Sequence, residues 1–198
     1  MAKTFFDALT ELSPNRREAL QDVHFFWADE RCVPPNSSES NFGLAECSLL
    51  QPLAVPGDHI HRIRGELPPE SAQLAAAEEL RRVASPSDNG QPRLDLVLLG
   101  MGEDGHIASL FPGTPPEGPG EIYRVVEAVK PPPQRITLTF GALQAAREVW
   151  VLASGPGKEE ALRSSLLADG RTPLGELLQR RAWTRIYTDI LIQDLGRP

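Results

Sequence analysis

The chain has 198 residues, of which 40% are hydrophobic and 24% charged, the proportions of an ordinary globular protein. This length suits one α/β domain, and the composition excludes disordered, collagen-like and disulfide-scaffold proteins. With 20 basic and 27 acidic residues the formal net charge is −7, which argues against a general polyanion binder. No nucleic-acid partner is therefore expected, and an anionic ligand has to be held by a few local cations.

The two cysteines, Cys32 and Cys47, are too few for a disulfide framework and lack the spacing of a zinc site. We therefore expect a reducing, cytoplasmic environment and no metal centre. No apolar run approaches the length of a membrane span, and the first residues contain no small-residue cleavage site. We expect no membrane partner, and a monomer or a weak homo-oligomer.

The first half of the chain predicts helices around a strand and a charged segment. Apolar residues at helical spacing predict an amphipathic helix over residues 5–12, and Asn15 is expected to cap a further turn to Leu20. The aromatic run 23–28 predicts a buried strand that ends at the charged tip Asp29-Glu30-Arg31. Helices are then expected at 41–50 and 70–84, with a short strand at 59–63.

The second half contains the strongest strand signal, the apolar run from Leu94 to Leu99, which we expect to be central in the sheet. The later elements predicted are strands at 123–129, 135–139, 149–153 and 184–188, and helices at 141–147, 158–168 and through 178. Strands that alternate with helices across short loops predict a single α/β domain over residues 1–198. Its sheet is expected to be open and mostly parallel, with helices on both faces, as in Rossmann-like folds.

Polar residues follow three of the predicted strands, at Asp29–Arg31, Gly100–His106 and Ser154–Lys158. Open parallel sheets bind ligands beyond the carboxyl ends of their strands. We therefore expect these three clusters to converge on one rim of the sheet.

A G-x-G-x-x-G pattern from Gly100 to Gly105 formally matches the fingerprint of dinucleotide-binding loops. Two features disfavour a nicotinamide cofactor. The loop carries Glu103 and Asp104 where a pyrophosphate has to approach, and Pro112 limits the helix predicted after Gly105 to a few residues. The glycines fit better as a tight loop that exposes backbone N–H groups and presents the next residue at a helix start.

That next residue is His106. A histidine titrates near neutrality, so it can take a proton from water and return it to a leaving oxygen. Asp104 is placed to orient the ring, and the loop amides are placed to stabilise an oxyanion. The plainer alternative is a histidine that only caps or packs the turn, but the adjacent acidic residues and the strand end favour the catalytic interpretation.

Two cations stand at the other strand ends. Arg31 suits bidentate binding of a phosphate or carboxylate, with a surface ion pair as the alternative. Lys158 follows Gly155-Pro156-Gly157 at a helix start, which favours an anion, with a solvated lysine as the alternative. The remaining histidines and the tryptophans are interpreted as structural, the tryptophans as core residues: His24, His59, His61, Trp27, Trp150 and Trp183.

With these residues the chain resembles the 6-phosphogluconolactonase family, which has the glucosamine-6-phosphate isomerase-like α/β fold. The most specific matching stretch runs from Asp95 through the glycine loop and His106 to Gly113. The other matching stretches, in family order along the chain, are Trp27–Pro34, Ser40-Asn41-Phe42, Arg135–Thr139 and Gly157-Lys158.

The resemblance implies a carboxylic ester hydrolase that converts 6-phospho-D-glucono-1,5-lactone to 6-phospho-D-gluconate in the oxidative pentose phosphate pathway. It implies that His106, assisted by Asp104, activates water and then protonates the departing ring oxygen. It also implies substrate and phosphate contacts at Arg31, Asn41, Gly102, Gly105, Arg135 and Lys158, with Arg135 the weaker phosphate ligand. No cofactor is expected, because a lactone is already an activated ester.

Two other interpretations stay open. Related sugar-phosphate deaminases share the strand and GxGxDGH loop but continue with Phe-Asn-Glu-Pro, where this chain has Ser109-Leu110-Phe111-Pro112. The missing acidic residue makes a glucosamine-6-phosphate deaminase-like isomerase the second choice. The third is a catalytically impaired, non-enzymatic remnant that keeps the fold and binds a partner.

The third interpretation comes from the amino terminus. Members of the resembled family normally begin with a strand and a Gly-Gly-Ser-Thr-Pro loop, followed by a helix that resembles residues 3–9. We therefore expect a domain without its first strand and without one wall of its phosphate site. Weak lactone hydrolysis is expected of this chain, with rescue by an upstream strand and glycine- and serine-rich loop.

Overall fold

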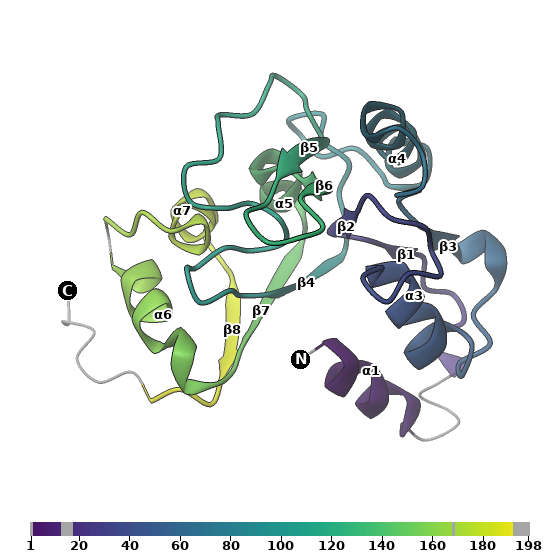
Figure 1. Ribbon diagram of the computed structural model, residues 1–198, viewed down its shortest axis with the longest axis horizontal. Coiled ribbons are helices and arrows are strands. Elements are labelled where there is room, and N and C mark those ends of the chain that lie inside the picture. Colours follow the sequence, from purple (N-terminus) through teal and green to yellow (C-terminus); the bar gives the residue numbers. More distant parts are fainter. Residues whose placement is uncertain (1, 13–17, 168, 192–198) are drawn as a thin grey trace.

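The computed structural model describes residues 2–12, 18–167 and 169–191, which form short strands with flanking helices (Figure 1). The α-helices are α1 (Ala2–Thr10), α3 (Asn41–Ala45), α4 (Pro69–Val83), α5 (Phe140–Ala145), α6 (Glu159–Leu166) and α7 (Pro173–Arg180). The strands are β1 (Phe25–Phe26), β2 (Asp29–Arg31), β3 (Ile60–His61), β4 (Leu96–Gly100), β5 (Tyr123–Glu127), β6 (Gln134–Leu138), β7 (Glu148–Ala153) and β8 (Arg185–Thr188). Shorter helical turns are η1 (Glu46–Leu50), η2 (Gly57–His59) and η3 (Pro156–Lys158).

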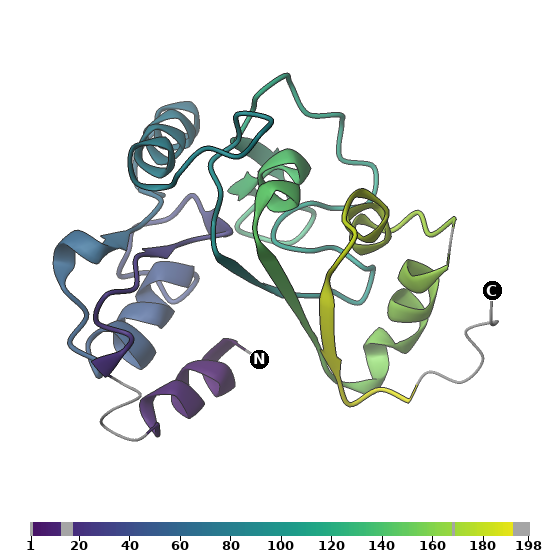
Figure 2. The same ribbon diagram turned by 180° about the vertical axis from the view of Figure 1, so that it is seen from behind.

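The strands are hydrogen-bonded in three separate sets. The sets β4-β7-β8 and β1-β3 are parallel, whereas β2-β6-β5 is antiparallel. Figures 1 and 2 show α6 and α7 beside the β4-β7-β8 set, and α3 and α4 beside the β1-β3 pair. The predicted α/β class and its parallel pairing are confirmed, but the described strands do not join into one continuous sheet.

β4 lies at an edge of its set, so the prediction that it is central is wrong. Within the described residues it pairs with β7 alone, and Leu96 is 40% exposed. The centre of the set is β7, in which Val149 and Val151 are buried. An apolar run indicates a strand, but it does not show whether that strand pairs on one side or on both. The sequence therefore predicts the strand correctly and its position in the sheet incorrectly.

The charged segment Asp29–Arg31 is not the tip of the aromatic strand, as the sequence predicts, but a strand of its own. The aromatic strand is confirmed only at Phe25–Phe26, and β2 then pairs antiparallel with β6. The register places Glu30 opposite Ile136 and Arg31 opposite Arg135. This partner lies far along the chain, so the local pattern of charges contains no sign of the pairing.

Most predicted helices are confirmed with shifted ends. α1 packs against the core through Phe5, Phe6 and Leu9, while the expected cap Asn15 lies outside the described residues. The helix predicted over 41–50 is divided into α3 and the π-helical turn η1. α4 buries Ala77 and Leu80, whereas its Leu74 is 62% exposed. Among the described helices none is both long and apolar enough to cross a membrane.

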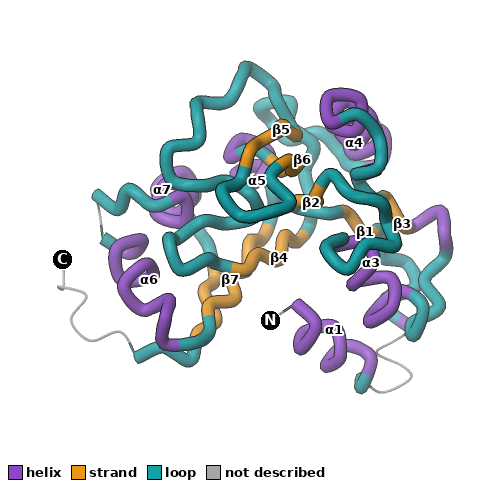
Figure 3. Tube along the Cα trace, in the orientation of Figure 1, coloured by secondary structure: helices purple, strands orange, loops and turns teal. Residues whose placement is uncertain are grey.

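Residues 101–122 contain no helix, so the prediction of a short helix after Gly105 is wrong (Figure 3). Gly105 and Ala108 have positive φ angles of 79° and 47°, which interrupt a right-handed helix. The segment is held instead by the buried side chains of Ile107 and Leu110. Isolated bridges join Ile107 to Met101 and to Leu110, which gives this loop a fixed shape without regular structure.

The tryptophans divide between core and surface. Trp27 is 8% exposed and packs against Phe42, as expected of a core residue. Trp150 is half-buried and meets Tyr187 edge to face. Trp183 is 86% exposed, so its prediction as a core residue is wrong. Trp183 lies outside regular structure, just before β8, where nearby apolar residues do not establish burial.

Arg181 stabilises the end of α5. Its guanidinium donates hydrogen bonds to the main-chain carbonyl groups of Leu143, Gln144 and Ala146, at 3.1, 2.5 and 2.8 Å. We expect Arg181→Ala to lower the free energy of unfolding by about 1–3 kcal/mol, because the carbonyl groups of the buried residues Leu143 and Ala146 lose a charged donor. Urea unfolding measures this, and Arg147→Ala, which breaks only an exposed ion pair, should change stability far less. Equal losses in the two variants would contradict this role.

The three histidines interpreted as structural form one cluster, which the sequence did not predict. His24 Nδ1 lies 2.8 Å from His61 Nε2, and His61 Nδ1 lies 2.6 Å from a Glu79 carboxylate oxygen. The His59 ring packs on the His24 ring, with 4.1 Å between centroids. A carboxylate only accepts hydrogen bonds, so His61 Nδ1 donates to Glu79.

This cluster predicts that acid weakens the fold. Desolvation and the neighbouring His59 and His61 rings lower the pKa of His24 below its ordinary value, so the unfolded chain binds its proton more readily. The contribution of the neutral His24 to the free energy of unfolding should be fully present above about pH 6.5. It should decline as the pH falls below that value, toward the lowered pKa of the folded state. Thermal unfolding across this range measures the decline, and His24→Asn should flatten it. An unchanged slope in the variant would contradict the assignment.

Candidate active site

The loop after β4 holds His106 and Asp104 in direct contact. His106 Nδ1 lies 2.6 Å from Asp104 Oδ1, which also accepts the backbone N–H of His106 at 3.1 Å. Partial burial opposes ionisation of Asp104, but these two hydrogen bonds outweigh it and hold its pKa below the ordinary value. Because the carboxylate accepts a hydrogen bond from the Nδ1–H group of His106, the Nε2 atom of the neutral ring is left as a proton acceptor.

Two glycines allow this loop geometry. A Cβ on Gly102 would lie 2.1 Å from His106 Nδ1, so any larger residue displaces the ring. Gly105 combines a φ of 79° with close contact to Thr172, whose Cβ would lie 2.6 Å from an added Cβ. Gly102 and Gly105 therefore have a structural role in shaping the loop, while their predicted contacts with a substrate stay a prediction.

Phe111 links the His106 ring to a cation. The rings of His106 and Phe111 have centroids 4.9 Å apart, and the guanidinium carbon of Arg135 lies 5.7 Å from the Phe111 centroid. No sequence pattern indicates a function for Phe111. Its position shortly after His106 was the only available signal, because the contact with Arg135 depends on the fold.

Arg31 and Arg135 stand opposite each other on β2 and β6. Arg31 donates to the Glu39 carbonyl, while its buried Nε has no hydrogen-bond partner among the described residues. Burial and the nearby charge of Arg31 lower the pKa of Arg135. Like charges directly opposite each other destabilise a strand pair, so this arrangement favours an anion between or beside the two guanidinium groups.

Hydrogen bonds to Asp29 hold the Asn41 side chain beside β2. Its side-chain amide donates to the Asp29 carbonyl oxygen at 3.0 Å and to the Asp29 carboxylate at 3.2 Å. The second Asp29 carboxylate oxygen accepts a hydrogen bond from Ser109 at 2.6 Å. Asp29 therefore connects the start of α3, which carries Asn41, to the loop that carries His106, a link that no local sequence pattern predicts.

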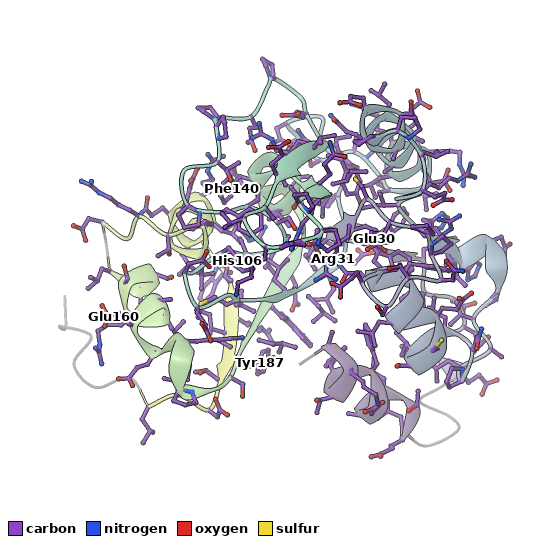
Figure 4. The ribbon with its side chains drawn as sticks, viewed as in Figure 1. Glu30, Arg31, His106, Phe140, Glu160 and Tyr187 are labelled. Atoms are coloured by element: carbon purple, nitrogen blue, oxygen red, sulfur yellow. The ribbon has the colours of Figure 1, made fainter. Side chains whose placement is uncertain are left out.

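A cavity of about 1000 Å³ lies beside the loop that carries His106. Its lining includes Gly102, Asp104, His106, Arg135 and Lys158, but not Arg31, Asn41 or Gly105. Figure 4 shows His106 and Arg31 in the central part of the molecule, from the loop after β4 and from the end of β2.

The segment after β7 reaches the same cavity. Lys158 lies at the start of α6, and its ammonium group forms no hydrogen bond or ion pair within the described residues. The Glu103 carboxylate lies against Gly157, where an added Cβ would approach it to 3.0 Å. The loops after β4 and β7 therefore meet, and the Ser109–Asp29 bond brings the third predicted cluster to them. The clusters converge, but not on the rim of one sheet, because Asp29–Arg31 is a strand of the separate antiparallel set.

The site contains no evident metal ligands. Within the described residues no group of three or more histidine, cysteine or acidic side chains is arranged to hold a metal ion. The chemistry available is a histidine base with an oriented ring, beside cationic side chains that suit an anionic substrate.

Comparison with known proteins identifies relatives. Residues 1–184 match the family described as glucosamine-6-phosphate isomerases/6-phosphogluconolactonase. A 6-phosphogluconolactonase from Mycobacterium tuberculosis is 42% identical over 153 residues, which cover 73% of this chain and 61% of the relative. The chain thus matches about three fifths of that relative's length.

Solved structures share the fold. The crystal structure of 6-phosphogluconolactonase from Thermotoga maritima is 28% identical, with a TM-score of 0.77 over 94% of this chain and 79% of the other. A monomeric glucosamine-6-phosphate deaminase has a TM-score of 0.78 over 94% of this chain and 80% of the other, but at 17% identity it shows the shared fold alone. The match over residues 1–184, together with the lactonase relative, shows that this chain belongs to the glucosamine-6-phosphate isomerase/6-phosphogluconolactonase family.

Proposed function

We propose that this chain hydrolyses 6-phospho-D-glucono-1,5-lactone to 6-phospho-D-gluconate. The observation that carries the proposal is the 2.6 Å contact between Asp104 and His106 Nδ1, at a cavity that Arg135 and Lys158 also line. The free acceptor nitrogen of His106 suits hydrolysis of an ester, and the neighbouring cations suit a phosphate group on the same substrate. The lactonase relatives support the same substrate class.

In the proposed reaction His106 Nε2 removes a proton from a water molecule as the water oxygen attacks the lactone carbonyl carbon. The carbonyl oxygen becomes an oxyanion. The N–H groups of Gly102, Gly105 and His106 already donate within the loop, so the cations that line the cavity are proposed to stabilise the negative charge. The tetrahedral intermediate collapses, the bond from the carbonyl carbon to the ring oxygen breaks, and the imidazolium returns its proton to that oxygen. Asp104 holds the ring and stabilises its charged form.

The phosphate is proposed to bind the cations around the cavity. Lys158 and Arg135 line the cavity directly, and Arg31 stands opposite Arg135 on the adjacent strand. An arginine pair suits the planar, multidentate contacts that a phosphate makes. Asn41, whose backbone N–H and that of Arg31 donate to the same Glu30 oxygen, is proposed to contact the phosphorylated end, and the loop glycines Gly102 and Gly105 to complete the binding of the sugar ring.

This function is tested by supplying the lactone and following 6-phosphogluconate with a coupled dehydrogenase that reduces NADP⁺. We expect a rate above spontaneous hydrolysis. Release of ammonia from glucosamine 6-phosphate, with no lactone hydrolysis above background, would instead support the deaminase-like alternative. A parallel assay on the chain extended by a strand and a Gly-Gly-Ser-Thr-Pro loop tests the expectation of weak activity.

A further inference from the structure

Among the described residues Glu30 has a buried carboxylate with four hydrogen-bond donors, although the sequence pattern predicts only a charged tip at this position. Glu30 is 2% exposed. One carboxylate oxygen accepts the backbone N–H groups of Arg31 and Asn41, both at 2.8 Å. The other accepts the Ser40 hydroxyl at 3.0 Å and the Phe42 N–H at 2.7 Å. Four donors therefore surround one buried charge.

These four bonds join two segments that carry polar side chains of the candidate site. Arg31 belongs to the end of β2, whereas Asn41 begins α3, beyond the intervening loop. The two segments are also linked by the Arg31 guanidinium, which donates to the Glu39 carbonyl, and by the Asn41 amide, which donates to Asp29. Glu30 lies at the centre of this junction.

We propose that Glu30 is a positioning residue, which fixes Arg31 and Asn41 in the geometry that binds the phosphorylated end of the substrate. This inference rests on the proposed function. Glu30 itself touches no substrate, because its carboxylate is buried and its hydrogen bonds are all made within the protein. His106 is carried by a different loop, so Glu30 acts on binding rather than on the proton transfer.

The role needs a carboxylate rather than any polar group of the same size. A glutamine keeps one acceptor oxygen but replaces the other by an NH₂ group, which cannot accept a hydrogen bond. That NH₂ group would face the backbone N–H of Phe42, or those of Arg31 and Asn41. Buried donors left without an acceptor are costly, so the junction has to open and move both polar side chains.

The test compares Glu30→Gln with the unaltered chain. We expect KM for the lactone to rise about ten- to a hundredfold while kcat changes by less than about threefold. Inhibition by 6-phosphogluconate should weaken by a similar factor, whereas inhibition by unphosphorylated gluconate should stay the same. A purely structural role would lower the folded fraction and the apparent kcat without this selective loss of phosphate recognition.

Two further variants keep the test informative. Arg181→Ala loses stability away from the cavity, and its KM should be unchanged. Ser40→Ala removes one of the four bonds to Glu30, so it should fold and raise KM by a smaller factor, even where Glu30→Gln fails to fold. An unchanged KM in Ser40→Ala, or equal KM increases in Glu30→Gln and Arg181→Ala, would overturn the positioning role.

Binding of inorganic phosphate separates this inference from the proposed function. Titration of the unaltered chain should show binding that Glu30→Gln weakens. If the unaltered chain binds phosphate but does not hydrolyse the lactone, the proposed reaction fails and the positioning role is judged on phosphate binding alone. If the unaltered chain hydrolyses the lactone and both proteins bind phosphate equally, only the role of Glu30 is overturned.

Discussion

His106→Ala is expected to lower kcat for lactone hydrolysis by about 10²- to 10⁴-fold, the contribution typical of a positioned general base. The variant loses both the acceptor Nε2 and the group that returns a proton to the ring oxygen. Binding of 6-phosphogluconate should be retained, because the cations around the cavity are unaffected. Comparison of kcat with the inhibition constant of the product measures the two effects separately.

Asp104→Asn tests how the ring is oriented. The amide offers either an oxygen or an NH₂ group to His106 Nδ1, so the protonated Nδ1 tautomer is no longer enforced. We expect kcat to fall, but by less than in His106→Ala. His24→Ala is the matched control, because that histidine belongs to the cluster around Glu79 and does not line the cavity. Full activity of His106→Ala would eliminate His106 as the base.

Local sequence patterns predicted the contact between Asp104 and His106 in the loop after β4. A strong strand followed by closely spaced glycines and acidic residues is a local signal, and the structure places Asp104 and His106 2.6 Å apart. The need for Gly102 follows from the same contact, because its missing side chain makes room for the imidazole. The error was the helix expected after Gly105, since no pattern revealed the positive φ of Ala108.

Long-range pairing explains what the sequence did not predict. The pairing of Arg31 with Arg135 depends on the register of β2 against β6, which the intervening chain does not encode locally. The position of β4 at the edge of its set is a similar case, because it depends on which strands find each other. The burial of Glu30 was not predicted because a charged residue is usually solvent-exposed. Only the fold shows the four donors that surround its carboxylate.

Arg31→Ala and Arg135→Ala are each expected to raise KM for the lactone by about ten- to a hundredfold, with little change in kcat. Each variant removes one of two cations that face each other across β2 and β6. If both arginines contact the same phosphate, the effects should be non-additive in the double variant. Titration with inorganic phosphate measures the loss without the chemical step.

The arginine pair also predicts an unusual relation between binding and stability. Removing either arginine relieves the repulsion between like charges across the strands, which offsets part of the hydrogen bonding that is lost. For Arg135 those lost bonds run to the carbonyl groups of Pro132 and Lys130, at 3.2 and 3.4 Å. Stability should therefore change little while phosphate binding falls. Added phosphate should raise the unfolding temperature of the unaltered chain more than that of either variant.

This ligand-dependent stabilisation separates an anion site from an ordinary structural pair. A structural pair would be indifferent to phosphate, and both variants would simply unfold at lower temperature. The matched control is Arg147→Ala, whose arginine forms an exposed ion pair with Asp95 and does not line the cavity. If phosphate stabilises this control and the two variants to the same extent as the unaltered chain, Arg31 and Arg135 do not form the phosphate site.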